Sequence, residues 1–200
     1  MACADGLRFS FRERMSGPFA RGLDNPTIGA ERGRAAGTVF VGDFTVTIDD
    51  LAACVAAPDH PARLGGTVSF DDLASKAPIT DGSLQLYAAD RETGMKRMEY
   101  RADFRGRDGA AYRLVAKKFI RPGRATIREQ VTAHGRLTKL AEDGHEATVV
   151  AAGVLVFRVR DLPAFLWSMR AEGASRILGL RQFLGFARRE LQTPVPVSPA

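Results

Sequence analysis

The sequence predicts a mainly β protein: an antiparallel, lipocalin-like β-barrel of about eight to ten strands with C-terminal α-helices packed on it. The strongest evidence lies at residues 95–120, where apolar and polar side chains alternate on both sides of a glycine-containing turn, as in a β-hairpin. Glycines also interrupt other predicted strands, and a closing sheet uses glycine to bend. After residue 160 the apolar spacing changes from strand-like to helical.

Four further strands are expected before this hairpin. They cover residues 7–15, 38–48, 63–70 and 82–88. The Ser16-Gly17-Pro18 sequence is expected to end the first strand. Residues 18–37 show little apolar periodicity and are predicted to form a connecting loop with one helical turn near residues 28–35. Asp49 is expected to cap a short helix at residues 50–56, and residues 72–80 are expected to form a looser crossing.

The rest of the chain is predicted to complete the sheet and then to become helical. Strands are expected at residues 125–140 and 147–159, and helices at residues 164–171 and 174–191. Asp161 followed by a proline is typical of a helix start. The domain prediction is therefore one domain at residues 1–192, helical from about 161 to 192, with a disordered proline-rich tail at 193–200.

Composition excludes several classes of function. The chain has 29 Lys and Arg against 23 Asp and Glu, a net charge of +6, but its arginines are spread out, which is typical of a solvated surface. No nucleic-acid recognition motif accompanies the charge, so we expect no nucleic-acid binding. Two cysteines indicate neither a disulfide framework nor a zinc site. The N-terminus lacks a signal-peptide core and no run approaches the ~18 apolar residues of a membrane span, so a cytoplasmic protein is predicted.

No sequence motif identifies a reaction. The P-loop, the nucleophile elbow, the H-E-x-x-H motif and the G-x-G-x-x-G fingerprint are all missing from the sequence, so we predict no metal and no cofactor and assign no catalytic residue. Five polar residues are candidates for ligand binding: Glu13, Lys96, Tyr100, Lys117 and Glu129. Both carboxylates lie among apolar neighbours in predicted strands, where an unpaired charge is costly. Together the five could bind a ligand or perform acid–base chemistry, or they could form a buried ion-pair network that fills the barrel.

The second C-terminal helix is amphipathic. Ile177, Leu180, Leu184, Ala187 and Leu191 form its predicted apolar stripe. Arg181, Arg188 and Arg189 are expected to face away from this stripe. The pattern fits a helix packed on the barrel, and it also fits a weak contact with a membrane surface through these arginines.

Eight short stretches together resemble a known domain. They are FRERMSG (11–17), GRAAGT (33–38), TVTIDDL (45–51), PDHP (58–61), GTVSF (66–70), MKRMEY (95–100), AGVL (152–155) and FLGFA (183–187). They are similar to the domain of unassigned role in large bacterial multidomain proteins, where it lies between a cholesterol-oxidase-like module of the glucose–methanol–choline oxidoreductases and an α/β-hydrolase-like module. The resemblance implies a stand-alone relative associated with lipid or sterol metabolism. It implies no activity, no flavin site and no hydrolase triad.

This chain departs from that domain after Lys118, where the relatives have a longer acidic segment that contains tryptophan and this chain has only residues 119–124. If that segment lines the binding site of the relatives, a different ligand, or none, is expected here.

The leading functional prediction is a non-catalytic binding or accessory domain for a hydrophobic small molecule, lipid- or sterol-like. One alternative is a barrel-type isomerase, cyclase or hydratase that uses Glu13 or Glu129 together with Tyr100 or Lys96. A third possibility is an interaction domain that docks partner enzymes through its basic helix.

Overall fold

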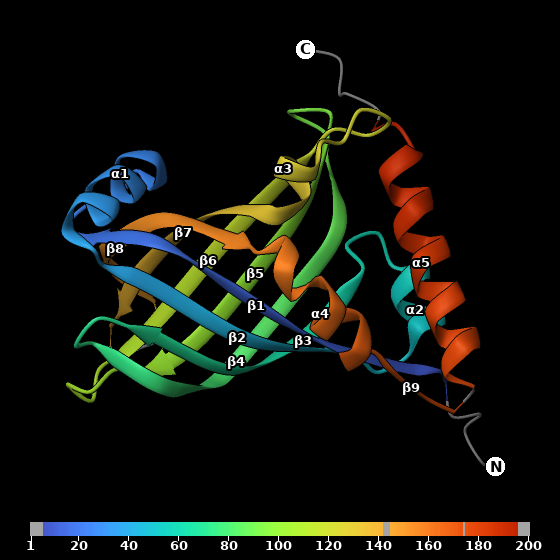
Figure 1. The fold of residues 1–200 in the computed structure, drawn as a ribbon, viewed down its shortest axis with the longest axis horizontal. Helices are drawn as coiled ribbons and strands as arrows, with labels where there is room; N and C mark the ends of the chain where they lie inside the picture. The colour runs from blue at the N-terminus through green and yellow to red at the C-terminus, as the bar shows by residue number, and fades with distance from the viewer. Residues whose placement is uncertain (1–5, 142–144, 174, 196–200) are drawn as a thin grey trace.

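A closed β-barrel forms the body of the molecule. The computed structural model describes residues 6–141, 145–173 and 175–195. In these residues nine strands form one antiparallel sheet, and β1–β8 close into a barrel because β1 pairs with both β2 and β8 (Figure 1). Consecutive strands are neighbours throughout, so the barrel has up-and-down topology. The predicted mainly β barrel with helices in its C-terminal part is confirmed.

The bounds of the elements follow the chain order. The strands are β1 (Arg8–Arg21), β2 (Val39–Ile48), β3 (Pro61–Phe70), β4 (Ala74–Asp90), β5 (Met95–Arg105), β6 (Ala111–Ile120), β7 (Thr132–Leu140), β8 (Glu146–Phe157) and β9 (Arg170–Glu172). The helices are α1 (Pro26–Ala36), α2 (Leu51–Ala56), α3 (Ile127–Val131), α4 (Leu162–Ser168) and α5 (Arg176–Gln192), and a 3-10 turn occupies Val159–Asp161.

The β5–β6 hairpin has the alternation that the sequence predicted. Tyr100 pairs with Ala116 and Ala102 with Leu114, and all four side chains are buried in the barrel. The intervening residues point outward and are partly exposed. Because one face of each strand is buried along its length, a shift of one residue would turn every core side chain outward.

Strand β1 makes the contacts that close the barrel. One edge pairs with β2 from Phe9 to Pro18. The other edge pairs with β8 from Met15 to Arg21 and with β9 from Arg8 to Ser10. Residues 11–14 have no strand partner on this second edge among the described residues. Here the Arg12 N–H donates instead to Ser168 Oγ at 2.8 Å, at the end of α4. We call residues 11–14 and this contact the seam.

The predicted end of β1 at Ser16-Gly17-Pro18 is wrong, since the strand continues to Arg21. The β1–β8 register passes over Gly17 and Pro18, so the N–H that proline lacks is not needed for pairing on this edge.

Helix α1 replaces most of the loop predicted at residues 18–37. Asn25 caps its first turn by accepting from Thr27 N–H and Ile28 N–H, and Pro26 opens the helix. Its buried residues are Gly29, Ala30 and Gly33. The helix therefore packs through small residues, which let its backbone approach β1 and β8, and a hydrophobic pattern does not reveal such a helix.

Four other features differ from prediction. Most of the residues expected as a looser crossing, from Ala74 onward, belong to the long strand β4. Asp50 rather than Asp49 caps α2. The strand predicted at 125–140 is divided into α3 and β7, because Thr126 and Glu129 form a capping box that starts a helix. The predicted first C-terminal helix is shorter and gives way to β9, so the C-terminal part is not helical throughout.

Helices α1 and α5 lie at opposite ends of the barrel (Figure 1). Helix α5 buries Gly179, Phe183 and Phe186, and the Phe183 ring stacks on Phe9 with the ring centroids 4.6 Å apart. The predicted apolar stripe is therefore wrong in part, since Ile177 is 73% exposed and Leu184 is 46% exposed. No helix in the described ranges is long and apolar enough to span a bilayer. Of the predicted tail, Val195 is buried and residues 196–200 lie outside the described residues.

Candidate ligand cavity

A cavity of about 640 Å³ enters the barrel at the α5 end. Its walls are mostly apolar and come from the barrel strands and from α4 and α5, with Phe11, Leu86, Met98 and Phe183 among them. Leu162 and Leu184 line its outer part and are 41% and 46% exposed, so the cavity opens at the surface. We call this opening the mouth.

The inner part of the cavity has a polar group formed by three buried side chains. Tyr100 Oη donates to Glu13 Oε2 at 2.9 Å, and Lys118 Nζ donates to Glu13 Oε1 at 3.1 Å. Lys118 Nζ also lies 5.0 Å from the centroid of the Tyr100 ring, within the range of a cation–π contact. Both oxygens of the Glu13 carboxylate accept a hydrogen bond, and its charge is paired with that of Lys118. The carboxylate therefore has its hydrogen-bond and charge partners within the otherwise apolar wall.

Tyr100 acts as a donor in this cluster. Burial, followed by the nearby Glu13 carboxylate, raises the pKa of Tyr100 well above its ordinary value of 10. The phenol therefore stays protonated at neutral pH and keeps its hydrogen bond to Glu13.

Tyr87 is a second phenol that lines the cavity, and it was not among the predicted site residues. It lies where the β4–β5 register shifts between Gln85 and Ala88, and its φ of 52° is in the left-handed region, which is strained for a bulky residue. Bulges of this kind redirect a side chain. Burial, Glu13 and Glu190 raise the pKa of Tyr87 to about 12. Its hydroxyl makes no hydrogen bond to another described residue, so it is available to a ligand.

Lys96 belongs to a separate buried cluster and does not line the cavity. Its Nζ donates to Glu190 Oε2 on α5 at 2.7 Å, and His60 Nε2 lies 3.7 Å from the same oxygen. His60 Nδ1 lies 2.9 Å from the carbonyl oxygen of Cys54; a carbonyl only accepts, so Nδ1 is the donor. The cluster ties α5 to the barrel from the side. His60 is itself buried.

Lys117 and Glu129 also lie outside the cavity. Lys117 is on the outer face of β6, where its Nζ is 3.4 Å from Glu99 Oε2. Glu129 accepts from Thr126 N–H in the capping box and from Arg121 Nε at 2.7 Å, and these contacts lower its pKa. The expected strand environment of Glu129 is wrong. Of the five candidates, the structure places only Glu13 and Tyr100 in the cavity.

The partner that completes the inner group, Lys118, was not among the predicted site residues. A signal for it exists in the sequence: Tyr112, Leu114, Ala116 and Lys118 share one face of β6. A lysine on a buried apolar face requires an acid on another strand, and Glu13 on the apolar face of β1 supplies it.

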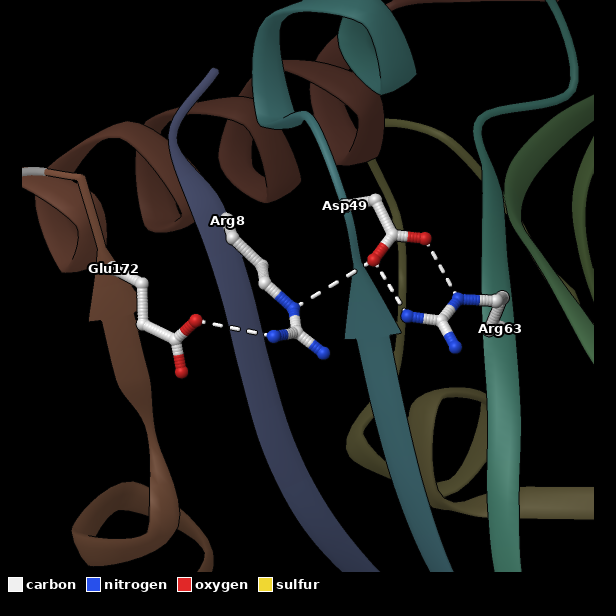
Figure 2. Close-up of polar contacts among 4 residues, drawn as sticks. All are labelled: Arg8, Asp49, Arg63 and Glu172. Carbon is white, nitrogen blue, oxygen red and sulfur yellow. Dashed lines mark hydrogen bonds and ion pairs between the residues drawn. The ribbon is translucent and has the colours of Figure 1, made fainter. Parts of the chain in front are cut away.

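An ion-pair chain on the outer surface holds β9 against the barrel. Figure 2 shows Glu172 of β9, Arg8 of β1, Asp49 after β2 and Arg63 of β3 in one row. Arg8 contacts Glu172 at 3.1 Å and Asp49 at 3.6 Å, and Arg63 binds Asp49 through two hydrogen bonds of 2.6 Å. The Arg63 contact lowers the pKa of Asp49. Because α5 follows β9 directly, this row helps to set where α5 begins beside the mouth.

The described residues contain no group of three or more His, Cys, Asp or Glu able to hold a metal ion. Comparisons of the chain with protein-family models, with curated proteins and with solved structures found no match. Fold and cavity together define an eight-stranded up-and-down barrel whose cavity has mostly apolar walls and a polar group, formed by Glu13, Tyr100 and Lys118, at its inner end.

Proposed function

We propose that this protein binds a hydrophobic small molecule, lipid- or sterol-like, inside the barrel in the manner of a lipocalin. The observation that supports this most directly is the cavity itself, which is apolar along its walls and polar at one place. Barrels of eight strands can hold one small ligand. A volume of about 640 Å³ lies within the range of about 300–1,000 Å³ that is usual for small-molecule sites.

The polar group favours a ligand that carries an uncharged hydroxyl or carbonyl. Glu13 and Lys118 neutralise each other, so the inner end offers no unpaired charge to an ionic head group. The free hydroxyl of Tyr87 can donate to a ligand oxygen or accept from a ligand hydroxyl. Such a ligand fits the proposed relationship to a domain associated with lipid or sterol metabolism.

An acid–base enzyme is supported less well. The Glu13 carboxylate would have to release Lys118 or Tyr100 before it could take a proton from a substrate. The other proposed acid–base partners, Glu129 and Lys96, lie outside the cavity. Binding without chemistry therefore agrees better with the arrangement.

Native mass spectrometry of the purified protein, followed by organic extraction, tests this proposal. We expect an apolar molecule to co-purify, or a neutral solvatochromic dye such as Nile red to bind at one site per chain. Ala187→Trp, which places a large ring on the cavity wall, should abolish binding, and Glu129→Gln outside the cavity should not. A folded protein that carries no ligand and binds no dye, or a dye that binds both variants equally, would refute the proposal.

A further inference from the structure

We propose that the mouth of the cavity docks on an anionic lipid bilayer, through exposed apolar side chains and arginines of α4 and α5. This inference extends the proposed function, since a bilayer is the source from which a lipid-like ligand would reach the cavity. It commits to a membrane surface as the partner and not to an acidic protein.

Helix α5 presents a mixed row of side chains on the face opposite its buried one. Ile177, Arg181, Leu184 and Arg188 follow each other at helical spacings of four, three and four residues, so they share one side of the helix. All four are exposed. Leu184 and Arg188 also line the cavity, which places one end of this row at the mouth.

Helix α4 adds a second set of exposed apolar side chains beside the first. Leu166 is 43% exposed and Trp167 is 73% exposed, and Leu162 one turn earlier lines the cavity. The start of α5 is joined to them, because Arg176 Nη2 donates to the carbonyl oxygens of Leu166 at 3.3 Å and Trp167 at 3.1 Å. The Arg176 guanidinium lies 5.5 Å from the centroid of the Trp167 ring. These contacts link the end of α4 to the start of α5, and we call the exposed side chains of the two helices the rim.

The charge of this rim is positive and unpaired. Arg181, Arg188 and Arg189 on α5, Arg158 after β8 and Arg124 before α3 have no carboxylate within ion-pair distance in the part of the chain that is described. Arg124 lies between the cavity-lining residues Gly123 and Ala125, and Arg158 follows Phe157, which also lines it. Arginines around an apolar opening suit a surface with anionic head groups above hydrocarbon. An acidic protein would match the charge but gives no reason for a ligand cavity to open in the centre of the contact.

Trp167 makes the proposal directly measurable, because it is the only tryptophan in the chain. Vesicles of phosphatidylcholine with phosphatidylglycerol should shift its emission to the blue, and brominated lipids should quench it. Vesicles of phosphatidylcholine alone should do neither. Each arginine near an anionic surface contributes about a fivefold gain in partitioning, so Arg181→Glu with Arg188→Glu should weaken binding by at least about thirtyfold.

The matched control carries the same charge change at the other end of the barrel. Arg32→Glu with Arg34→Glu alters two exposed arginines of α1 and should leave vesicle binding within a few fold of the parent. Equal losses in both double variants would show a nonspecific charge effect and overturn the proposal. So would vesicle binding without a change in Trp167 emission, the absence of vesicle binding, or binding to acidic polypeptides in place of vesicles.

The outcome is separable from that of the cavity experiment. A protein that carries ligand but leaves anionic vesicles unbound would refute docking alone. A protein that binds vesicles through the mouth but carries no ligand and no dye would refute the cavity function alone.

Discussion

Replacing Lys118 by methionine should destabilise the fold far more than the same change at its neighbour, Lys117. Lys118 is 3% exposed at its side chain and donates to Glu13, which is 8% exposed. Methionine fills a similar volume, so Lys118→Met removes the charge and leaves the Glu13 carboxylate buried with one donor, Tyr100. Breaking a buried pair from one side costs about 3–5 kcal/mol.

The contacts of Lys118 support a similar magnitude. A hydrogen bond to a charged group contributes about 1.5–3 kcal/mol. The cation–π contact with Tyr100 at 5.0 Å contributes about 0.5–2 kcal/mol. Lys117 is 41% exposed and its pair with Glu99 lies on the outer face, so Lys117→Met should cost only about 0–1 kcal/mol.

Urea denaturation followed by circular dichroism measures both variants. Glu13→Gln combined with Lys118→Met leaves no unpaired charge inside the barrel, so its cost should fall below the sum of the single changes by about 1–3 kcal/mol. If Lys117→Met and Lys118→Met lose the same stability, or if the two changes at Glu13 and Lys118 are additive, the pair does not exist as described and the cavity has a different inner end.

Three further outcomes follow from single contacts. Gly153→Ala should destabilise the protein by several kcal/mol in thermal melts, because a Cβ there would lie 2.2 Å from the carbonyl oxygen of Pro18. Gly185→Ala is the control and should not destabilise the protein, because a Cβ at that position meets open space. Equal melting temperatures for the two variants would contradict the β1–β8 contact. Tyr87→Phe should leave the melting temperature nearly unchanged yet weaken dye or ligand binding, and undiminished affinity would exclude its hydroxyl as a ligand contact. Burial raises the pKa values of Tyr87 and Tyr112 to about 12 and raises the pKa of Tyr100 well above its ordinary value, so folded protein should show no phenolate absorbance near pH 10. As the pH rises, the tyrosines of the unfolded chain lose their protons before those of the folded protein. The stability that depends on these protonated tyrosines should therefore be fully present below pH 10 and fall between about pH 10 and 12. A tyrosine that titrates near pH 10 in the folded state would contradict this.

Local alternation predicted the barrel because each strand has one face in the core. The same rule extends to single polar residues: Lys96 and Lys118 lie on the buried faces of β5 and β6 and are both ion-paired to acids. Lys117, chosen in place of Lys118, lies on the other face. The strand pattern alone therefore places Lys118 on the buried face of β6, although Lys117 was predicted as the site residue.

The partners of these lysines could not be found in the same way. Glu13 is 105 positions from Lys118, and Glu190 is 94 positions from Lys96, on a helix that packs over the barrel end. No local period connects positions so far apart. The bulge that turns Tyr87 into the cavity is also invisible locally, because it arises from a register shift between β4 and β5. The length of helix α1 was underestimated for a related reason, since the helix packs on the β1 and β8 backbones through Gly29 and Gly33, which carry no hydrophobic signal.

The position of Glu13 connects the closure of the barrel with the cavity. Glu13 belongs to the seam, where neither β8 nor β9 pairs with β1 and α4 forms the wall instead. Phe165 of α4 fills the space beside it through edge contacts with Phe11 and Phe157, at centroid distances of 5.3 and 5.6 Å. Helix α4 contacts β1 here through hydrogen bonds between the Ser168 hydroxyl and the Arg12 backbone and through aromatic contacts, and such contacts open at lower cost than a strand in a hydrogen-bonded ladder. We therefore expect the barrel wall to open most easily beside its buried carboxylate, where α4 forms the wall, and the same helix carries the exposed Trp167.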